Sequence, residues 1–176
     1  MPVVETTILE GYDAATKARL LKGMMRAVRS VMAAPPDGIV TILREVHPSS
    51  YARGGVSRIP GPPLPPAADV AAAFAAALEK GDAEAAGALA TPDFFGTDLH
   101  GERRDLSGSL AASTKFRKAY QRFEDAMTDE DRIVFAQGTL EGTAPDGTVL
   151  SDVRFVDRFR LTGALIAEME TWVSRT

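Results

Sequence analysis

The chain has 176 residues, of which 45% are hydrophobic and 25% charged, a composition that indicates a folded globular protein and excludes wholesale disorder. It contains no cysteine, which excludes disulfides, thiolate nucleophiles and cysteine-ligated metals. The net charge of −4 divides into +3 over residues 1–60 and −7 over residues 61–176, and neither part has the dense basic stripe of a nucleic-acid-binding protein.

The N-terminal sequence and the length of the apolar runs indicate where in the cell the protein is expected. No apolar run reaches the roughly 18 to 20 residues that a membrane span needs. The start, MPVVETTILEG, has no basic segment followed by an apolar core, which a secretory signal requires. We therefore expect a cytoplasmic protein with no membrane and no nucleic-acid partner.

The first 59 residues predict a strand, a helix and a second strand. Val3 to Leu9 is rich in β-branched residues, and Ile39 to Val46 is similar. Between them, Asp13 is a suitable N-cap for a helix that the Pro35-Pro36-Asp37-Gly38 segment ends. The helix has an apolar stripe at three- and four-residue spacing: Ala14, Ala18, Leu21, Met25, Val28 and Met32. A connection of this length makes the strands parallel, so we expect a right-handed β-α-β unit, followed by a turn at Gly54-Gly55.

A β-α-β unit of this size cannot enclose its own core. Its two strands keep bare edges, and one face of the pair has no helix to cover it. We therefore predict that this part packs on copies of itself or on the rest of the chain, and that the protein is a homo-oligomer.

A proline-rich segment divides the chain. Five of the seven residues in Pro60–Pro66 are proline, which excludes a helix or an inner strand and favours an extended spacer. We predict a first domain at 1–59, a linker at 60–66 and a second domain at 67–176.

The second domain predicts helices first and strands later. The expected helices are one through Val70 to Leu78 ended by Gly81, a short one capped by Asp82, and one from Leu106 to Tyr120, with a turn at Pro92 to Gly96. Strands are expected at Ile133 to Gly142, Val149 to Leu161 and Leu165 to Val173. Their tight turns predict an antiparallel sheet, and the whole predicts an α+β layer fold.

The Met1-Pro2 start suggests a catalytic amine. Removal of Met1 would expose a prolyl secondary amine, and a free α-amino group has a reference pKa of about 8, suited to general-base catalysis. The alternative is a proline without a role. Together with Glu10-Gly11, the β-α-β order, Tyr51 and the Gly54-Gly55 tip, this start resembles the 4-oxalocrotonate tautomerase family over residues 2–59.

The tautomerase resemblance implies ring-like assembly and Pro2 as the base that moves a proton in an enol or keto acid. Members of that family have substrate-binding arginines where this chain has Tyr12 and Val40, whereas Tyr51 matches an aromatic pocket position. Arg44 or Arg53 would then supply the cation, although Arg44 equally suits a solvated or interface charge. We expect a bulkier, less charged enol or enone. His47 is expected to lie in a loop.

The strand from Val149 to Leu161 places one carboxylate on an apolar face. Asp157 alternates with Val153, Phe155, Phe159 and Leu161, so its hydration would be lost and its pKa should rise, which suits an acid or base near neutral pH. The alternative is a core aspartate that a tyrosine, arginine or backbone donor satisfies. On the last strand, Ala167 and Met169 are expected in the core, and Trp172 either packs or lies at a pocket rim.

The order of helices, the Pro92-Asp93-Phe94-Phe95 segment and the long strands with a turn at Gly163 resemble the SnoaL-like, nuclear-transport-factor-2-like cone fold over residues 67–176. That family includes ketosteroid isomerases, polyketide cyclases and epoxide hydrolases. The resemblance implies a curved sheet around an apolar pocket, often in a dimer, with His100 as a partner for Asp157 or a solvent-exposed turn residue.

The main prediction is a cofactor-independent isomerase or tautomerase that uses Pro2 on an enol, enone or keto compound, with a second hydrophobic pocket around Asp157. The alternative is a SnoaL-like cyclase, isomerase or ligand-binding protein in which the first part serves only for oligomerisation. The two histidines lack metal-ligand spacing, so we expect no metal and no cofactor, and a small-molecule substrate.

Overall fold

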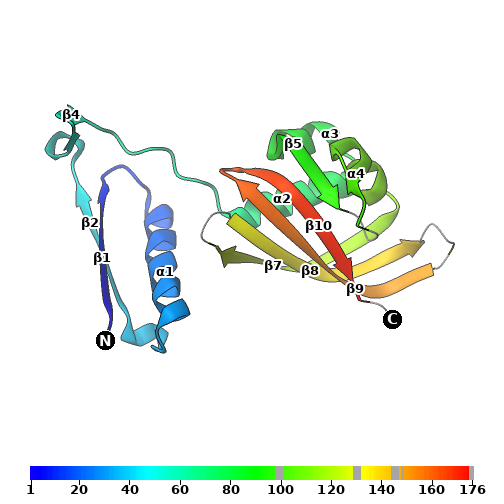
Figure 1. Ribbon diagram of the computed structural model, residues 1–176, viewed down its shortest axis with the longest axis horizontal. Coiled ribbons are helices and arrows are strands. Elements are labelled where there is room, and N and C mark those ends of the chain that lie inside the picture. The colour runs from blue at the N-terminus through cyan, green and yellow to red at the C-terminus, as the bar shows by residue number, and fades with distance from the viewer. Residues whose placement is uncertain (98–100, 129–131, 144–146, 148, 175–176) are drawn as a thin grey trace. The chain divides into compact units, whose positions relative to one another are not determined.

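A computed structural model describes the chain except for residues 98–100, 129–131, 144–146, 148 and 175–176. The chain divides into two compact units, Met1–Pro63 and Leu64–Thr176, which are called unit 1 and unit 2 below (Figure 1). Residues 58–66 between the last strand of unit 1 and the first helix of unit 2 form neither helix nor strand.

Unit 1 has the predicted β-α-β order. Strand β1 (Val3–Leu9) pairs in parallel with β2 (Val40–Val46), and helix α1 (Ala14–Val31) connects them (Figure 1). The Asp13 carboxylate accepts the Thr16 amide at 2.7 Å, which holds the pKa of Asp13 below its ordinary value and caps α1. Short 3-10 turns at Pro36–Gly38 and Pro48–Ser50 precede and follow β2.

A small hairpin ends unit 1. Strands β3 (Ala52–Arg53) and β4 (Val56–Ser57) are antiparallel, and Gly54 and Gly55 both have positive φ between them, as the predicted turn requires.

Unit 1 has no closed core. None of its 63 residues is fully buried, and of the predicted helix stripe Leu21, Met25 and Val28 are half-buried while Ala14, Ala18 and Met32 are exposed. A single helix covers only one side of a two-stranded ribbon, so the remaining apolar surface stays accessible.

Unit 2 is a layer of helices on a mixed sheet. Helices α2 (Ala67–Lys80), α3 (Ala83–Leu89) and α4 (Leu106–Ser113) lie on one face of the sheet (Figure 1). The sheet runs in the order β6-β5-β10-β9-β8-β7. Its strands are β5 (Ala90–Thr97), β6 (Arg103–Arg104), β7 (Phe116–Met127), β8 (Arg132–Thr143), β9 (Val149–Thr162) and β10 (Leu165–Val173). We call the face under the helices the inner face.

Two predictions for unit 2 are wrong. Pro92 to Gly96 lies in β5, which pairs in parallel with β10, so the sheet is mixed rather than antiparallel. Pro92 is tolerated because it falls where the β5–β10 register shifts and no ladder donor is needed. The predicted helix from Leu106 ends at Ser113, and Phe116 to Tyr120 begins β7 instead.

The core of unit 2 lies between α2 and the inner face. Phe74 of α2 is fully buried and contacts the rings of Phe94 and Phe159, with centroids 5.3 and 6.4 Å apart. Ala167 and Met169 are buried as predicted, and Ile166 is buried as well because the β10 register shifts beside Ala167. Among the described residues, no helix is long and apolar enough to cross a membrane.

Candidate functional site

A cluster of four polar side chains lies on the inner face of unit 2. Asp157, in the middle of β9, is fully buried. Thr171 is its direct neighbour on β10, while Lys118 and Tyr120 reach it from β7, two strands away. We call Lys118, Tyr120, Asp157 and Thr171 the Asp157 cluster.

Small residues on β8 make this reach possible. Strand β8 lies between β7 and β9, and it places Ala136 opposite Asp157 and Gly138 opposite Tyr120. A Cβ on Gly138 would lie 2.0 Å from the Ala119 carbonyl oxygen, so no larger residue fits there without moving β7. Because β7 and β9 are about 10 Å apart at normal strand spacing, only long side chains such as lysine and tyrosine span the gap.

The Asp157 carboxylate is saturated with donors. Lys118 Nζ donates to both carboxylate oxygens at 2.8 Å, and the Tyr120 hydroxyl donates to Oδ2 at 2.6 Å. Thr171 Oγ1 donates to Oδ1 at 2.7 Å and lies 3.1 Å from Lys118 Nζ. A carboxylate has about four acceptor positions, so a ligand can bond to Asp157 only when one of these donors leaves.

The surroundings of the cluster are aromatic. The Tyr120 ring stacks on Phe123 and meets Phe155 edge-on, each with centroids 5.1 Å apart, and Lys118 Nζ lies 4.9 Å from the Phe155 ring. Burial, followed by the negative charge of Asp157, raises the pKa of Tyr120 well above 10.0, so its phenol stays protonated. Lys118 keeps 18% of its side chain exposed, which makes it the charged member of the cluster that solvent reaches.

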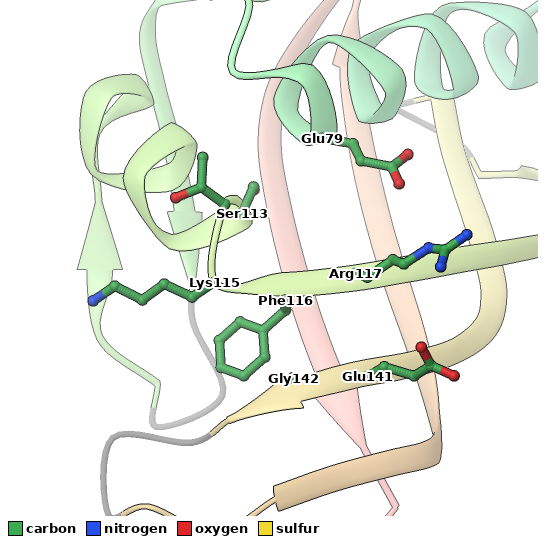
Figure 2. Close-up of a pocket in the computed structure, with 8 residues that line it drawn as sticks. Glu79, Ser113, Lys115, Phe116, Arg117, Glu141 and Gly142 are labelled. Carbon is green, nitrogen blue, oxygen red and sulfur yellow. The ribbon is translucent and has the colours of Figure 1, made fainter.

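A pocket of about 400 Å³ lies where α2, the start of β7 and the end of β8 meet (Figure 2). Glu79, Arg117 and Glu141 line one part of it, and Ser113 and Lys115 line another. The negative charge of Glu79 is the smallest of the contributions that raise the pKa of Tyr120, after burial and Asp157.

One predicted type of partner for Asp157, a tyrosine, is observed as Tyr120. Trp172, predicted to pack or to lie at a pocket rim, is 44% exposed and pairs across the strands with Val156, on the face opposite to Asp157. His100 lies outside the described residues. Lys118 and Tyr120 were missed because that segment was predicted to continue the helix from Leu106, and its residues do not alternate cleanly between apolar and polar.

The candidate residues of unit 1 fall into two groups at opposite ends of the strand pair. Pro2 precedes β1 and its carbonyl accepts the Val40 amide at 3.0 Å, so these two residues are neighbours. Tyr12, Tyr51 and Arg53 follow the far ends of β1 and β2. Strands of seven residues span about 20 Å, so one chain does not bring the two groups together.

Of the two predicted cations of unit 1, Arg53 is exposed in β3 and Arg44 is engaged in an ion pair. Arg44 forms an ion pair with Glu5 across the two strands, which fits the surface-charge interpretation. His47 Nδ1 contacts the Ser49 hydroxyl at 2.7 Å in the 3-10 turn after β2. Among the described residues, no group of three or more acidic or histidine side chains could hold a metal ion.

Unit 2 is a cone-shaped α+β domain. It has a curved mixed sheet, helices on one face of that sheet, and a buried polar cluster between the two layers. The sequence profile of the SnoaL-like domain family matches residues 71–169, more than half of the chain, and the chain belongs to this family.

Solved structures that are similar to this chain have low sequence identity to it. A cystatin-fold protein from Novosphingobium aromaticivorans is 19% identical over 58% of this chain and 94% of its own, with a TM-score of 0.46. A candidate ketosteroid isomerase from Shewanella frigidimarina is 14% identical over 60% and 93%, with a TM-score of 0.48. A candidate polyketide cyclase from Pseudomonas putida is 19% identical over 61% and 91%, with a TM-score of 0.47. No curated protein matches the chain.

Proposed function

We propose that unit 2 is the catalytic part of the chain, a cofactor-independent isomerase or cyclase that acts on a small, largely apolar carbonyl or enol compound at the Asp157 cluster. Unit 1 then serves as an assembly module in a homo-oligomer, because it leaves apolar surface accessible and has no closed core of its own. The reaction class is one that membership of the SnoaL-like family makes available.

The observation that carries this proposal is the fully buried Asp157 with Lys118 reaching it from the edge strand. A buried ion pair rarely adds stability over well-packed apolar residues, because both charges lose their hydration. The chain nevertheless keeps two small residues on β8 that allow this pair to form. Such an arrangement is expected where charged groups serve a reaction.

The chemistry follows from an exchange of hydrogen-bond donors. A substrate carbonyl oxygen that accepts a hydrogen bond from Lys118 or Tyr120 draws that donor away from Asp157. The carboxylate then has a free acceptor position for a proton from the carbon next to the carbonyl, and the donor stabilises the resulting enolate oxygen in an apolar site. In an isomerisation, Asp157 then returns the proton to another carbon. In a cyclisation, the enolate carbon attacks a second carbonyl, whose π electrons move to its oxygen, and Asp157 gives the proton to the alkoxide that forms.

The test measures exchange of α-protons with D2O by NMR for a panel of enones and β-keto esters. We expect exchange with the natural chain, and a loss of about 100-fold or more in Asp157→Asn, the range for removal of a general base. Asp152→Asn is the matched control, because Asp152 is an exposed aspartate on the same strand. An unchanged exchange rate in a folded Asp157→Asn protein would refute the proposal.

A second candidate function is tautomerisation by unit 1. It is favoured by Pro2, which stands directly before β1 in a parallel β-α-β unit. With Pro2 and Tyr51 at opposite ends of one strand pair, a site that uses both would need residues from more than one copy. Pro2 would be the base, and Tyr12, Tyr51 and Arg53 would bind an enol or enone.

Two measurements decide the second candidate. Intact mass determines whether Met1 is removed, and a retained Met1 excludes the prolyl base. Ketonisation of phenylenolpyruvate should be lost in Pro2→Ala and kept in Asp157→Asn. The reverse pattern would place the activity in unit 2.

A further inference from the structure

Lys118 is the least exposed lysine of the chain. Its side chain is 18% exposed and that of Lys17 is 30% exposed, and the remaining three lysines lie at exposed positions: Lys22, Lys80 and Lys115. Burial in apolar surroundings favours the neutral form of an amine, and only the neutral form has the electron pair that attacks a carbonyl carbon. Lys118 is therefore the lysine whose surroundings suit a nucleophile.

The groups around the Lys118 amine are placed to accept and return the protons that such a reaction moves. Both Asp157 oxygens lie 2.8 Å from Nζ, and Thr171 Oγ1 lies 3.1 Å away. Transfer of one proton from the ammonium to Asp157 leaves a neutral amine and a neutral acid, so neither group keeps a charge that burial disfavours. When that proton goes to Oδ1, the Tyr120 hydroxyl still donates to Oδ2 at 2.6 Å and holds the acid in place.

A nearby aromatic ring suits a cation at the same position. Lys118 Nζ lies 4.9 Å from the centre of the Phe155 ring. The face of an aromatic ring attracts a cation within about 6 Å. This attraction acts on an iminium nitrogen as well as on an ammonium group.

We propose that Lys118 is a covalent catalyst that forms a Schiff base with the carbonyl carbon of a small, largely apolar ketone or aldehyde. The inference deepens the proposed function and rests on it, because the carbonyl compound has to enter the Asp157 cluster. It narrows the substrate class to ketones and aldehydes, since esters and carboxylic acids do not form Schiff bases with an amine.

The reaction needs no reactant besides the carbonyl compound. After Asp157 takes a proton from Lys118, the Nζ electron pair forms a bond to the carbonyl carbon, and the carbonyl π electrons move to the oxygen. Asp157 gives its proton to that oxygen and takes one of the two protons on the attached nitrogen. Asp157 then protonates the new hydroxyl group, the nitrogen electron pair forms the C=N bond, the C–O bond breaks, and water leaves.

The product is an iminium ion beside the Asp157 carboxylate. This pair carries the same charges as the ammonium and carboxylate that it replaces, so no additional charge is buried. An iminium group withdraws electrons from the neighbouring carbon more strongly than a neutral carbonyl group does, so Asp157 removes the α-proton more readily and an enamine forms. Return of the proton to a carbon atom and addition of water to the iminium release the product and restore the lysine.

The first test traps the Schiff base in the full-length natural chain, with cyclohexanone as the ketone. Sodium cyanoborohydride reduces an iminium ion to a stable secondary amine, which adds the mass of the ketone without its oxygen. Chymotrypsin cleaves after Phe116 and so separates Lys118 from Lys115, the exposed lysine that serves as the internal control. We expect modification of Lys118 to be about tenfold faster than that of Lys115, or more. Equal rates, or no modification of Lys118, would overturn the proposal.

The second test distinguishes this inference from the proposed function. A Schiff base exchanges the oxygen of the ketone with water, whereas direct enolisation exchanges only the α-protons. We expect cyclohexanone labelled with heavy oxygen to lose its label at least as fast as it takes up deuterium from D2O. Lys118→Arg keeps a cation and a hydrogen-bond donor but forms no Schiff base, so the folded variant should lose both exchanges.

The outcomes of the second test lead to different conclusions. Deuterium uptake without loss of heavy oxygen above the buffer rate would overturn the covalent route and leave the proposed function standing. Full deuterium uptake in Lys118→Arg would do the same. Absence of both exchanges in the natural chain would refute the proposed function, and the trapping rate at Lys118 would still decide whether this lysine forms a Schiff base.

Discussion

Replacing Lys118 by methionine is expected to destabilise unit 2 strongly, because it leaves a buried charge behind. Lys118 Nζ lies 2.8 Å from both oxygens of Asp157, whose side chain has no exposure to water. After the substitution, only Tyr120 and Thr171 donate to the carboxylate. Breaking a buried ion pair by removing one partner costs about 3 to 5 kcal/mol.

Neutralising the remaining charge should recover much of that loss. In the double variant Lys118→Met with Asp157→Asn, the amide oxygen still accepts from Tyr120 or Thr171 and no charge is buried. The remaining cost is that of lost hydrogen bonds, about 1 to 3 kcal/mol. The double variant is therefore expected to be more stable than Lys118→Met alone.

Urea denaturation followed by tryptophan fluorescence measures these differences. Trp172 is the only tryptophan and lies in β10 next to Thr171, so the signal reports on unit 2. Lys115→Met is the control, because Lys115 is an exposed lysine just before β7 and its loss should change stability by less than about 0.5 kcal/mol. A cost below about 1 kcal/mol for Lys118→Met, or a double variant no more stable than the single one, would refute the argument from buried charge.

Three further predictions concern pH and backbone space in unit 2. Because the pKa of Tyr120 is raised in the folded protein, its phenol ionises at lower pH in the unfolded chain than in the folded one. The free energy of unfolding should therefore fall as pH rises above 10.0, and it should fall by less in Tyr120→Phe. Urea midpoints at pH 8 and about pH 11 measure the difference. Burial alone would raise the pKa of Glu168, but Arg158 and Arg160 outweigh it and lower that pKa below 4.5. The stability that Glu168 contributes is therefore lost as pH falls below 4.5. In acid denaturation, Glu168→Gln should lose less stability than the natural chain. In urea denaturation, Gly138→Ala should lower the free energy of unfolding by about 2 kcal/mol or more, because the new Cβ would meet the Ala119 carbonyl. Gly163→Ala should lower it by about 1 kcal/mol, because Gly163 has a positive φ but open space around it. Equal losses in the two variants would contradict this prediction.

Local signals in the sequence predicted many of the elements correctly. Asp13 and Asp82 cap α1 and α3 through their own side chains, and Gly81 ends α2 with a positive φ. The parallel β1–β2 pair and the long strands β8, β9 and β10 also lie where alternation and turn residues indicated. These features depend on residues within a few positions of each other, so the sequence expresses them directly.

The Asp157 cluster could be predicted only in part. The apolar alternation around Asp157 correctly indicated a buried carboxylate, and a tyrosine partner was among the alternatives. Which residues donate to Asp157 depends on how β7, β8, β9 and β10 pair. Lys118, Tyr120 and Thr171 are 14 to 39 positions away from Asp157 in the sequence. Periodicity in a short segment such as Leu106 to Tyr120 does not distinguish a helix followed by a strand from one longer helix.

The sequence alone determined the order of most elements, the helix caps, the proline-rich segment and the apolar surroundings of Asp157. Only the tertiary structure decided that β5 runs parallel to β10, that Phe116 begins an edge strand, and which donors reach the buried carboxylate. The physical reason is that strand pairing joins distant segments through backbone hydrogen bonds that any residue except proline can make, so the choice of partner depends on how the whole sheet packs against its helices.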